Sequence, residues 1–409
     1  MNYFFQMYSQ LSFFVFLMTS LCHCVVNLDI ADELNLINDV IEKRSMFSKC
    51  DPQIGRNVSV NVIFYPQFIV GLDEREQVLT SSGWIDLWWT DTRLTWNASN
   101  YGGIDKMYVK QNMIWIPDII TENSVAGLSI LGSGQDFVLV HSSGEVEWSP
   151  GNIYKTVCEI DVVTFPFDSQ ECFLNITSWM YFNDVVRLVT TDDSINMDFF
   201  KSNSEWILSN ISILETDFVF QNVDGAQGSI TFVFKLKRYS AFYVLKIIIP
   251  AIILSILNSF VFIVPPESGE KVSMSVTTML SLTVFLSYIG DITPNNSESI
   301  PIIALFVVLH LALGALSIIC NILILNIHYK ARKEKEMGHL RKETIVKRTN
   351  KTEPAEMNMD TIPEKEIISE RTVGQWALKI MRHIDIFFFG FFILLSAGVT
   401  IGCVTMMLN

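Results

Sequence analysis

Histidine is scarce in this sequence, and no catalytic motif accompanies the few histidines that occur. The six of them are spread along the chain without the close spacing that a metal site requires. The stretch Gly132-Ser-Gly134 lacks the lysine of a phosphate-binding loop, and no nucleophile elbow is present. The sequence therefore predicts that the protein is not an enzyme, needs no cofactor or metal, and binds no nucleic acid.

Charged residues are also few, at 18% of the chain, whereas 50% of the residues are hydrophobic and the mean hydropathy is +0.34. Four long apolar runs account for this imbalance, and each is long enough to cross a bilayer, which takes about 20 residues. They are Phe242–Val264, Val272–Ile289, Ile300–Ile327 and Ile384–Leu408. We expect four transmembrane helices, in preference to four buried helices of a large soluble core.

Cysteine is limited to seven residues. Two of them fall in the apolar segment 1–24, which we interpret as a cleaved signal peptide although no basic residue lies near Met1. Cys320 and Cys403 lie in apolar runs, where a thiol acts as an apolar filler. Cys50 is left over, and the sequence does not decide whether it is free or bridges to another chain.

Sequons and charge predict which segments lie outside the cell. Four glycosylation sequons precede the first apolar run, at Asn57, Asn97, Asn175 and Asn210. Residues 1–242 carry 14 Lys and Arg residues against 29 Asp and Glu residues, whereas residues 328–383 carry 13 against 9. Because basic residues stay inside, we expect 25–238 outside the cell and the loop 330–382 in the cytoplasm. The acidic exterior would concentrate cations, although ordinary surface solubility explains such charges equally well.

Hydrophobic periodicity predicts one helix and many strands before the first apolar run. Residues 28–44 show helical spacing of apolar residues such as Leu34 and Val40, which predicts an amphipathic helix. Residues 58–237 show short alternating runs broken by Gly, Asn, Asp and Pro, a pattern that predicts an all-β sandwich. The segment 331–371 is charged and poor in aromatic residues, so we expect much of it to be disordered, with helix resuming at 372–383.

The second apolar run carries an ordered polar stripe. Residues spaced three and four apart fall on one face of a helix. They are Glu270, Ser273, Thr277, Leu280, Val284, Ser287 and Asp291. The order of carboxylate, hydroxyls, apolar side chains, hydroxyl and carboxylate is typical of a cation-selective pore with an apolar gate. A helix-packing stripe of small hydroxyls is the alternative, but it does not explain the charged ends.

A segment bounded by two cysteines points to a protein family. Cys158 and Cys172 enclose thirteen residues that include Phe165-Pro166-Phe167, a sequence that favours a cis proline. This segment resembles the signature of the Cys-loop, nicotinic acetylcholine receptor-like pentameric ligand-gated ion channels. The resemblance implies a Cys158–Cys172 disulfide, which for a loop of this size stabilises by roughly 3 kcal/mol.

The same resemblance extends over nearly the whole chain after residue 28, and it implies a fold. The family consists of pentamers whose subunits have an extracellular, immunoglobulin-like all-β sandwich with an N-terminal helix, followed by a four-helix transmembrane domain. We expect the sandwich at 25–238, transmembrane helices one to three at 239–329, and the fourth helix at 383–409.

The resemblance also assigns roles in the pore and in its coupling to the exterior. Residues 265–271 are similar to the turn before the pore helix of nicotinic-type cation channels, and they lack the Pro-Ala-Arg type insertion of related anion channels. Glu270 would form the inner selectivity ring, and Leu280 with Val284 the hydrophobic gate. For coupling, the Phe165-Pro166-Phe167 knuckle should rest on the linker 290–301, and Arg238 should pair with Glu74.

Family motifs further mark a ligand site between subunits. Trp84 resembles the aromatic residue of the complementary face, and Trp179 resembles the central tryptophan of the second binding loop. Glu122 stands where the family usually has tyrosine, and the third loop offers Phe218 and Phe220 in place of adjacent cysteines and tyrosine. The aromatic cage that holds a quaternary ammonium ion in acetylcholine-type sites is therefore incomplete.

Core packing is the alternative role for Trp84 and Trp179. Four other motif residues should be scaffold: Trp89, Trp96, Trp115 and Asp118.

Two functions fit these departures from the family pattern. The first is a chemosensory receptor, similar to the chemotactile receptors of cephalopods, opened by hydrophobic, amphipathic or bitter molecules. The second is a complementary, non-α subunit of a heteropentameric acetylcholine receptor.

Either would be a multi-pass protein of the plasma membrane, at a sensory or postsynaptic cell surface. Its partners would be a small-molecule agonist, membrane lipid, and sodium and potassium ions. Calcium permeability, the agonist, and homopentamer against heteropentamer stay open.

Overall fold

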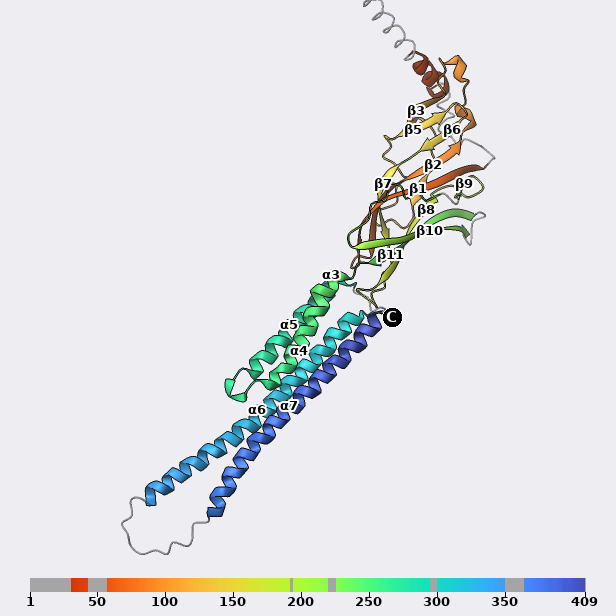
Figure 1. Cartoon of the computed structure of the whole chain (residues 1–409). Coiled ribbons are helices and arrows are strands. Elements are labelled where there is room, and N and C mark those ends of the chain that lie inside the picture. The colour runs from red at the N-terminus through yellow and green to blue at the C-terminus, as the bar shows by residue number, and fades with distance from the viewer. Residues whose placement is uncertain are drawn as a thin grey trace, which may run out of the picture. The chain divides into compact units, whose positions relative to one another are not determined.

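The computed structural model describes residues 31–42, 57–191, 194–219, 226–294, 300–349 and 364–408. These residues form two compact units, one rich in strands and one helical (Figure 1). The strand-rich unit takes the chain up to Ile160 and again over Ser169–Lys237, and the helical unit begins at Arg238. The segment Asp161–Asp168 groups with the helical unit, although strands flank it in the sequence.

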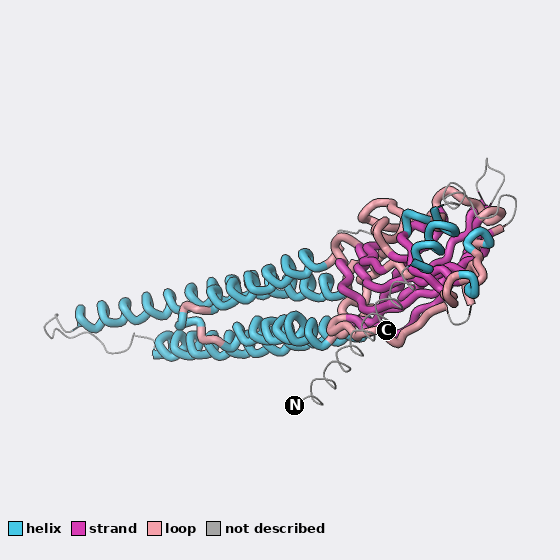
Figure 2. Tube along the Cα trace, turned by 90° about the horizontal axis from the view of Figure 1, so that it is seen from above, coloured by secondary structure: helices cyan, strands magenta, loops and turns pink. Residues whose placement is uncertain are grey.

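Two β-sheets make up the strand-rich unit, drawn in magenta in Figure 2. The larger sheet has seven strands in the order β3-β5-β6-β2-β1-β9, with β7 also paired to β2, and the smaller has the order β10-β11-β8-β4. The strands are β1 (Val58–Asp73), β2 (Val78–Thr90), β3 (Lys106–Lys110), β4 (Ile119–Thr121), β5 (Phe137–His141), β6 (Glu145–Trp148), β7 (Gly151–Val157), β8 (Ser169–Ser178), β9 (Val186–Val189), β10 (Trp206–Val219) and β11 (Ala226–Arg238).

Alternating apolar residues explain how the two sheets pack. In β1, the residues from Val58 to Phe64 alternate between buried positions and positions that face outward. The Phe64 ring lies 4.9 Å from the ring of Phe232, which belongs to β11 in the other sheet. Burial of such side chains stabilises the unit by roughly 25 cal/mol per Å² of apolar surface. The predicted all-β sandwich is confirmed.

The predicted N-terminal helix is confirmed over residues 31–42, and it ends in a π-helical turn over Ile37–Glu42. Leu36, Val40 and Ile41 are its buried apolar residues. Leu34, which the sequence places on the same face, is instead 61% exposed. The wider π-helical turn changes which residues share a face, and helical spacing alone does not predict it.

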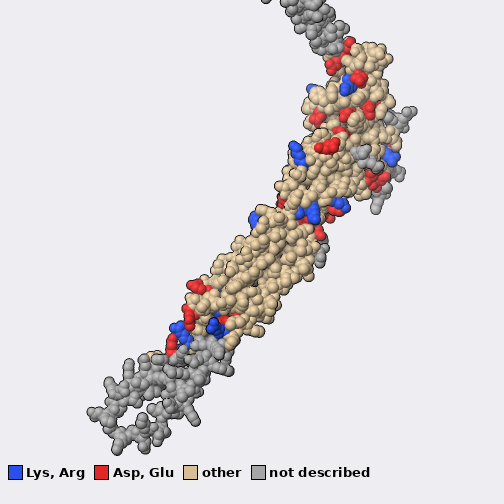
Figure 3. Space-filling model, viewed as in Figure 1, with Lys and Arg blue, Asp and Glu red and all other residues tan. Residues whose placement is uncertain are grey.

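The helical unit contains four helices that are long and apolar enough to cross a membrane, as predicted: Ala241–Ile263, Lys271–Ile292, Ile302–Lys333 and Arg382–Leu408. The first span is built from α3 (Ala241–Tyr243), a π-helical turn (Val244–Ile248), α4 (Ile249–Phe260) and a 3₁₀ turn (Val261–Ile263). The others belong to α5 (Lys271–Ile292), α6 (Ile302–Thr349) and α7 (Glu364–Leu408). Figure 3 shows an almost uncharged surface along the middle of these helices, as lipid contact requires.

The helices α6 and α7 are longer than the sequence analysis predicts. Residues 331–349 and 364–371, much of which we expected to be disordered, are helical, and 350–363 lie outside the described residues. The predicted helix over 372–383 is part of α7. Lys, Arg, Glu and Met are strong helix formers, and a helix that is already nucleated in the membrane extends at low cost. The exposed side chains of Arg332 and Glu336, one helical turn apart, form an ion pair with 3.0 Å between Nε and Oε1, which further stabilises this helix. High charge alone was therefore a wrong indicator of disorder here.

Candidate functional site

The polar stripe forms one exposed face of α5. All seven predicted residues, Glu270, Ser273, Thr277, Leu280, Val284, Ser287 and Asp291, are exposed in the single chain. Leu280 and Val284 are 65% and 64% exposed, although they are apolar and lie at the middle of the helix. No other part of the chain that the structure describes covers this face. It is therefore free to line a space shared with other subunits.

The opposite face of α5 is buried against helices of the same chain. Ser275, Thr278 and Leu282 are at most 7% exposed. The Asn321 amide of α6 donates a hydrogen bond to Ser275 Oγ at 3.4 Å, and Ser275 Oγ donates to the carbonyl oxygen of Lys271 at 3.1 Å. These contacts fix how α5 is rotated about its axis, and thus which residues lie on the exposed face.

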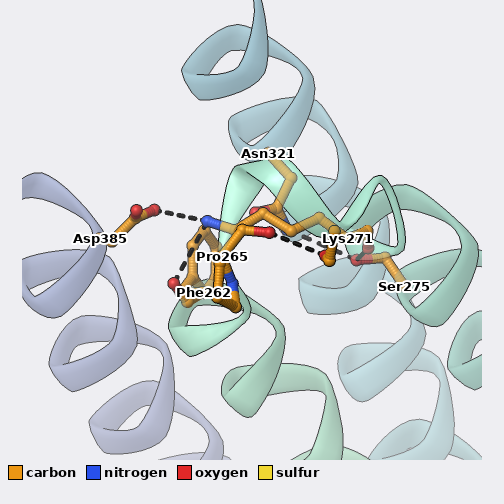
Figure 4. Close-up of polar contacts among 7 residues, drawn as sticks. Phe262, Pro265, Lys271, Ser275, Asn321 and Asp385 are labelled. Atoms are coloured by element: carbon orange, nitrogen blue, oxygen red, sulfur yellow. Dashed lines mark hydrogen bonds and ion pairs between the residues drawn. The ribbon is translucent and has the colours of Figure 1, made fainter. Parts of the chain in front are cut away.

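A buried ion pair holds the first residue of α5 (Figure 4). The Lys271 ammonium lies 2.8 Å from Asp385 Oδ1 of α7, and it also donates a hydrogen bond to the carbonyl oxygen of Phe262 at 3.2 Å. The Lys271 side chain is 1% exposed. Glu270 and Lys271 are neighbours in sequence, but the lysine charge is turned inward and paired, so it does not cancel the exposed Glu270 carboxylate.

The cysteine-bounded segment has the predicted covalent and backbone features. Cys158 and Cys172 form a disulfide, and the Phe165–Pro166 peptide bond is cis. Phe165 is buried, with its ring 4.9 Å from that of Tyr243 in α3.

The predicted contact between the Phe165-Pro166-Phe167 knuckle and the 290–301 linker is only partly covered by the described residues. Phe165 contacts Tyr243 and Arg238, and the contact beside the linker is made by Val163, whose carbonyl oxygen accepts a hydrogen bond from the Ile302 amide at 3.0 Å. Residues 295–299 of the linker lie outside the described residues. The role of Pro166 and Phe167 in coupling stays a prediction.

Arg238 has an acidic partner that the sequence analysis missed. Its Nε lies 2.8 Å from Asp168 Oδ1 and its Nη2 lies 3.1 Å from Asp168 Oδ2, with both side chains at most 1% exposed. The guanidinium carbon is also 4.9 Å from the centre of the Phe165 ring. Asp168 directly follows the knuckle in the sequence, and this position was the signal available for finding it. Glu74 directly follows β1, and its pairing with Arg238 stays a prediction.

Trp84 lies in an aromatic cluster on the outer face of the larger sheet. Its ring stacks on Tyr65 at 5.0 Å between centroids, and Phe199 lies 5.2 Å away. Trp84 also lines a cavity of about 410 Å³, together with residues that include Gln67 and Asn152. The Trp84 side chain is partly buried, and its role as a ligand contact stays a prediction.

Trp179 directly follows β8 and is more exposed than Trp84, at 53%. Asp118 fixes this position, because its carboxylate accepts hydrogen bonds from Ser178 Oγ at 2.5 Å and from the Met180 amide at 2.6 Å. The Trp179 amide donates to the carbonyl oxygen of Asp118 at 3.1 Å. Asp118 is thus scaffold, as predicted, and the exposed Trp179 ring is not part of the core.

The remaining predicted residues divide into three groups. Trp89 and Trp115 are buried scaffold with their ring centroids 6.0 Å apart, and Trp96 Nε1 donates to the carbonyl oxygen of Ile104 at 2.7 Å. Glu122 is exposed just after β4. Phe220 lies outside the described residues, and Phe218 is placed in β10 by its backbone alone.

The four predicted glycosylation sites differ in accessibility. Asn57, Asn97 and Asn210 are exposed, as a glycan acceptor must be. Asn175 is only partly exposed within β8, and its Oδ1 is enclosed. Glycosylation at the three exposed sites is therefore the stronger prediction.

Comparison with known proteins gives a consistent picture. The model of the neurotransmitter-gated ion-channel ligand binding domain matches residues 34–240, and the model of the neurotransmitter-gated ion-channel transmembrane region matches residues 247–383.

The chain is 35% identical to the neuronal acetylcholine receptor subunit beta-3 of Homo sapiens over 284 residues, 68% of this chain and 61% of that protein. It is 37% identical to the subunit non-alpha-2 of Carassius auratus over 264 residues, 64% of this chain and 56% of that protein. It is 32% identical to the Homo sapiens subunit beta-4 over 301 residues, 73% of this chain and 60% of that protein. The chain thus spans about three fifths of the length of these relatives.

Proposed function

Because the chain belongs to the neurotransmitter-gated ion-channel family, of the Cys-loop receptor type, we propose that it is a subunit of a pentameric, ligand-gated cation channel in the plasma membrane. The agonist binds outside the cell at the interface between subunits, and binding favours the open pore. A ligand can shift such an equilibrium only by as much as its affinity differs between the two states.

The observation that carries this proposal is the exposed stripe on α5. Five copies around one axis would bring Glu270 and Asp291 into two rings of carboxylates, which attract cations and repel anions. Leu280 and Val284 would form the narrow apolar gate between them, where loss of water stops conduction. The inward-turned Lys271 supports a net negative inner ring, since its charge is paired with Asp385.

The agonist site is formed where the Trp84 face of one subunit meets the Trp179 face of its neighbour. Glu122, Phe218 and Phe220 would line its other sides. The incomplete aromatic cage supports a chemosensory receptor for hydrophobic, amphipathic or bitter molecules, for which acetylcholine is a poor agonist. The exposed Trp179 ring would supply much of the contact area.

One observation favours a second candidate function. The relatives compared above include beta and non-alpha subunits, which fits a complementary subunit of a heteropentameric acetylcholine receptor. In such a receptor, Trp84 would form part of an interface agonist site whose complete aromatic cage belongs to a partner subunit.

Current recording from cells that express the chain alone, and with a cage-bearing partner, tests both functions. The chemosensory proposal expects the chain alone to respond to amphipathic compounds, with Trp179→Ala shifting the response strongly at unchanged surface expression. Micromolar activation of the chain alone by acetylcholine would contradict it. A chain that is silent alone but responds to acetylcholine with the partner would support the complementary subunit.

A further inference from the structure

Lys246 is a charged residue inside the first membrane-spanning helix. That span runs over Ala241–Ile263, and Lys246 is its only Asp, Glu, Lys or Arg residue. Lys246 lies in the π-helical turn Val244–Ile248, a rare conformation that is often found at functional sites. A charged side chain within a membrane span is costly, so its presence here calls for a physical reason.

Two aromatic rings contact the Lys246 ammonium. Its Nζ lies 4.5 Å from the centre of the Tyr288 ring of α5 and 5.2 Å from the centre of the Phe242 ring. Lys246 forms no ion pair with any residue that the structure describes, and its side chain is exposed in the single chain. Aromatic rings attract a cation without neutralising it, whereas a carboxylate would cancel its charge. The positive charge of Lys246 therefore acts on its surroundings.

The contact with Tyr288 brings this charge to the Asp291 end of the polar stripe. Tyr288 precedes Asp291 by three residues in α5, and residues three apart are neighbours on the surface of a helix. Snorkelling toward water is the alternative role for a lysine near the end of a span. A snorkelling lysine needs no contact with α5, whereas the Lys246 ammonium lies closest to a ring of that helix.

The two ends of the stripe differ in how the nearby lysine is compensated. At the Glu270 end, the Lys271 ammonium is buried and lies 2.8 Å from Asp385 Oδ1, so the charge of Glu270 keeps its full effect. At the Asp291 end, Lys246 has no carboxylate of its own among the described residues. Its positive charge is therefore free to oppose the negative charge of Asp291.

We propose that Lys246 is a selectivity-determining residue of the channel, which weakens the attraction of the Asp291 ring for cations, and for divalent cations most. This inference rests on the proposed channel function and extends it to a residue outside the pore helix. The energy of an ion in an electrostatic potential is proportional to the charge of the ion. A change of potential that raises the local sodium concentration about twofold thus raises that of calcium about fourfold.

Single-channel recording from Lys246 variants tests the proposal. Leu280→Thr serves as the background, because its expected leak current needs no agonist. Lys246→Met keeps an unbranched side chain without the charge, so inward conductance and the calcium-to-sodium permeability ratio should each rise about twofold. Lys246→Arg keeps the charge and should change neither quantity. Lys201→Met neutralises an exposed lysine of the strand-rich unit and should also change neither.

Chemical modification separates the charge of the side chain from its shape. In Lys246→Cys, 2-aminoethyl methanethiosulfonate attaches an ammonium group through a disulfide and releases methanesulfinate, and it should return the permeability ratio to its original lower value. Methyl methanethiosulfonate reacts in the same way but attaches a neutral group, so the ratio should stay raised. The same reagents applied to the Leu280→Thr background control for the native cysteines.

Failure of this inference is distinguishable from failure of the proposed channel function. A cation current with the same permeability ratio in Lys246→Met and Lys246→Arg would overturn the inference and leave the channel standing. A raised ratio in Lys246→Cys that the two reagents change equally would overturn it as well. A current that follows chloride, or no current from any variant, would contradict the proposed cation channel and the inference with it.

Discussion

The two faces of α5 contain the same kinds of residue, yet one is buried against the chain and the other is exposed. On both faces serine and threonine hydroxyls donate to backbone carbonyl oxygens of the same helix, as in Ser275 to Lys271 and Thr277 to Ser273. On the covered face the one charge, Lys271, is paired inside the protein. On the exposed face Glu270 and Asp291 stand at the two ends without an ion pair to any described residue.

Hydroxyl content is therefore similar on the face that packs inside the chain and on the face that we propose to line the pore. The two faces differ in whether their charged side chains are paired and in whether their large apolar side chains are buried. The covered face buries Leu282 and Ile289, whereas the other face leaves Leu280 and Val284 exposed at midhelix. Apolar exposure of this kind suits a gate that must lose its water, and unpaired carboxylates suit a path for cations.

Breaking the charge pair of the covered face should have the largest effect. Asp385→Asn leaves the Lys271 ammonium buried without its partner, which destabilises by roughly 3 to 5 kcal/mol. We expect loss of surface expression, measured by surface labelling, and a lower melting temperature of the purified protein.

The double variant Lys271→Met with Asp385→Leu is the matched control, because it removes both charges and keeps apolar volume. It should recover most of the expression. If Asp385→Asn reaches the surface at the normal level with unchanged melting temperature, the pair does not hold α5 in place.

Changing the middle of the exposed face should affect gating without affecting folding. Leu280→Thr places a hydroxyl at the apolar constriction, so the pore should admit water more readily. Leak current or a shift of about tenfold toward lower agonist concentration is expected in dose–response recordings. Leu282→Thr, on the buried face, is the control and should reduce stability instead. An unchanged dose–response curve for Leu280→Thr at normal surface expression would remove Leu280 from the pore.

Neutralising one end of the exposed face should have a smaller effect. Glu270→Gln removes one carboxylate per subunit from the proposed inner ring and should lower single-channel cation conductance by about twofold. Glu267→Gln neutralises a nearby exposed carboxylate outside the stripe and should change conductance less. Equal conductances in the wild type and in Glu270→Gln would argue against a ring of Glu270 carboxylates.

Much of the fold could be predicted from the sequence, because it depends on local patterns. Alternation in β1 predicts its buried face, and the 3-4 spacing of α5 predicts its exposed stripe. Partners distant in the sequence could not be predicted in this way. Asp385 is 114 residues from Lys271, and no local pattern links them.

The central claim is that the exposed face of α5 lines a cation pathway, and the reversal potential of the agonist-evoked current tests it most directly. In cells expressing this chain, with sodium and chloride replaced in turn, the reversal potential should follow sodium and potassium and stay constant when chloride is changed. The two carboxylates at the ends of the stripe are the reason for this expectation. A reversal potential that follows chloride would contradict the account.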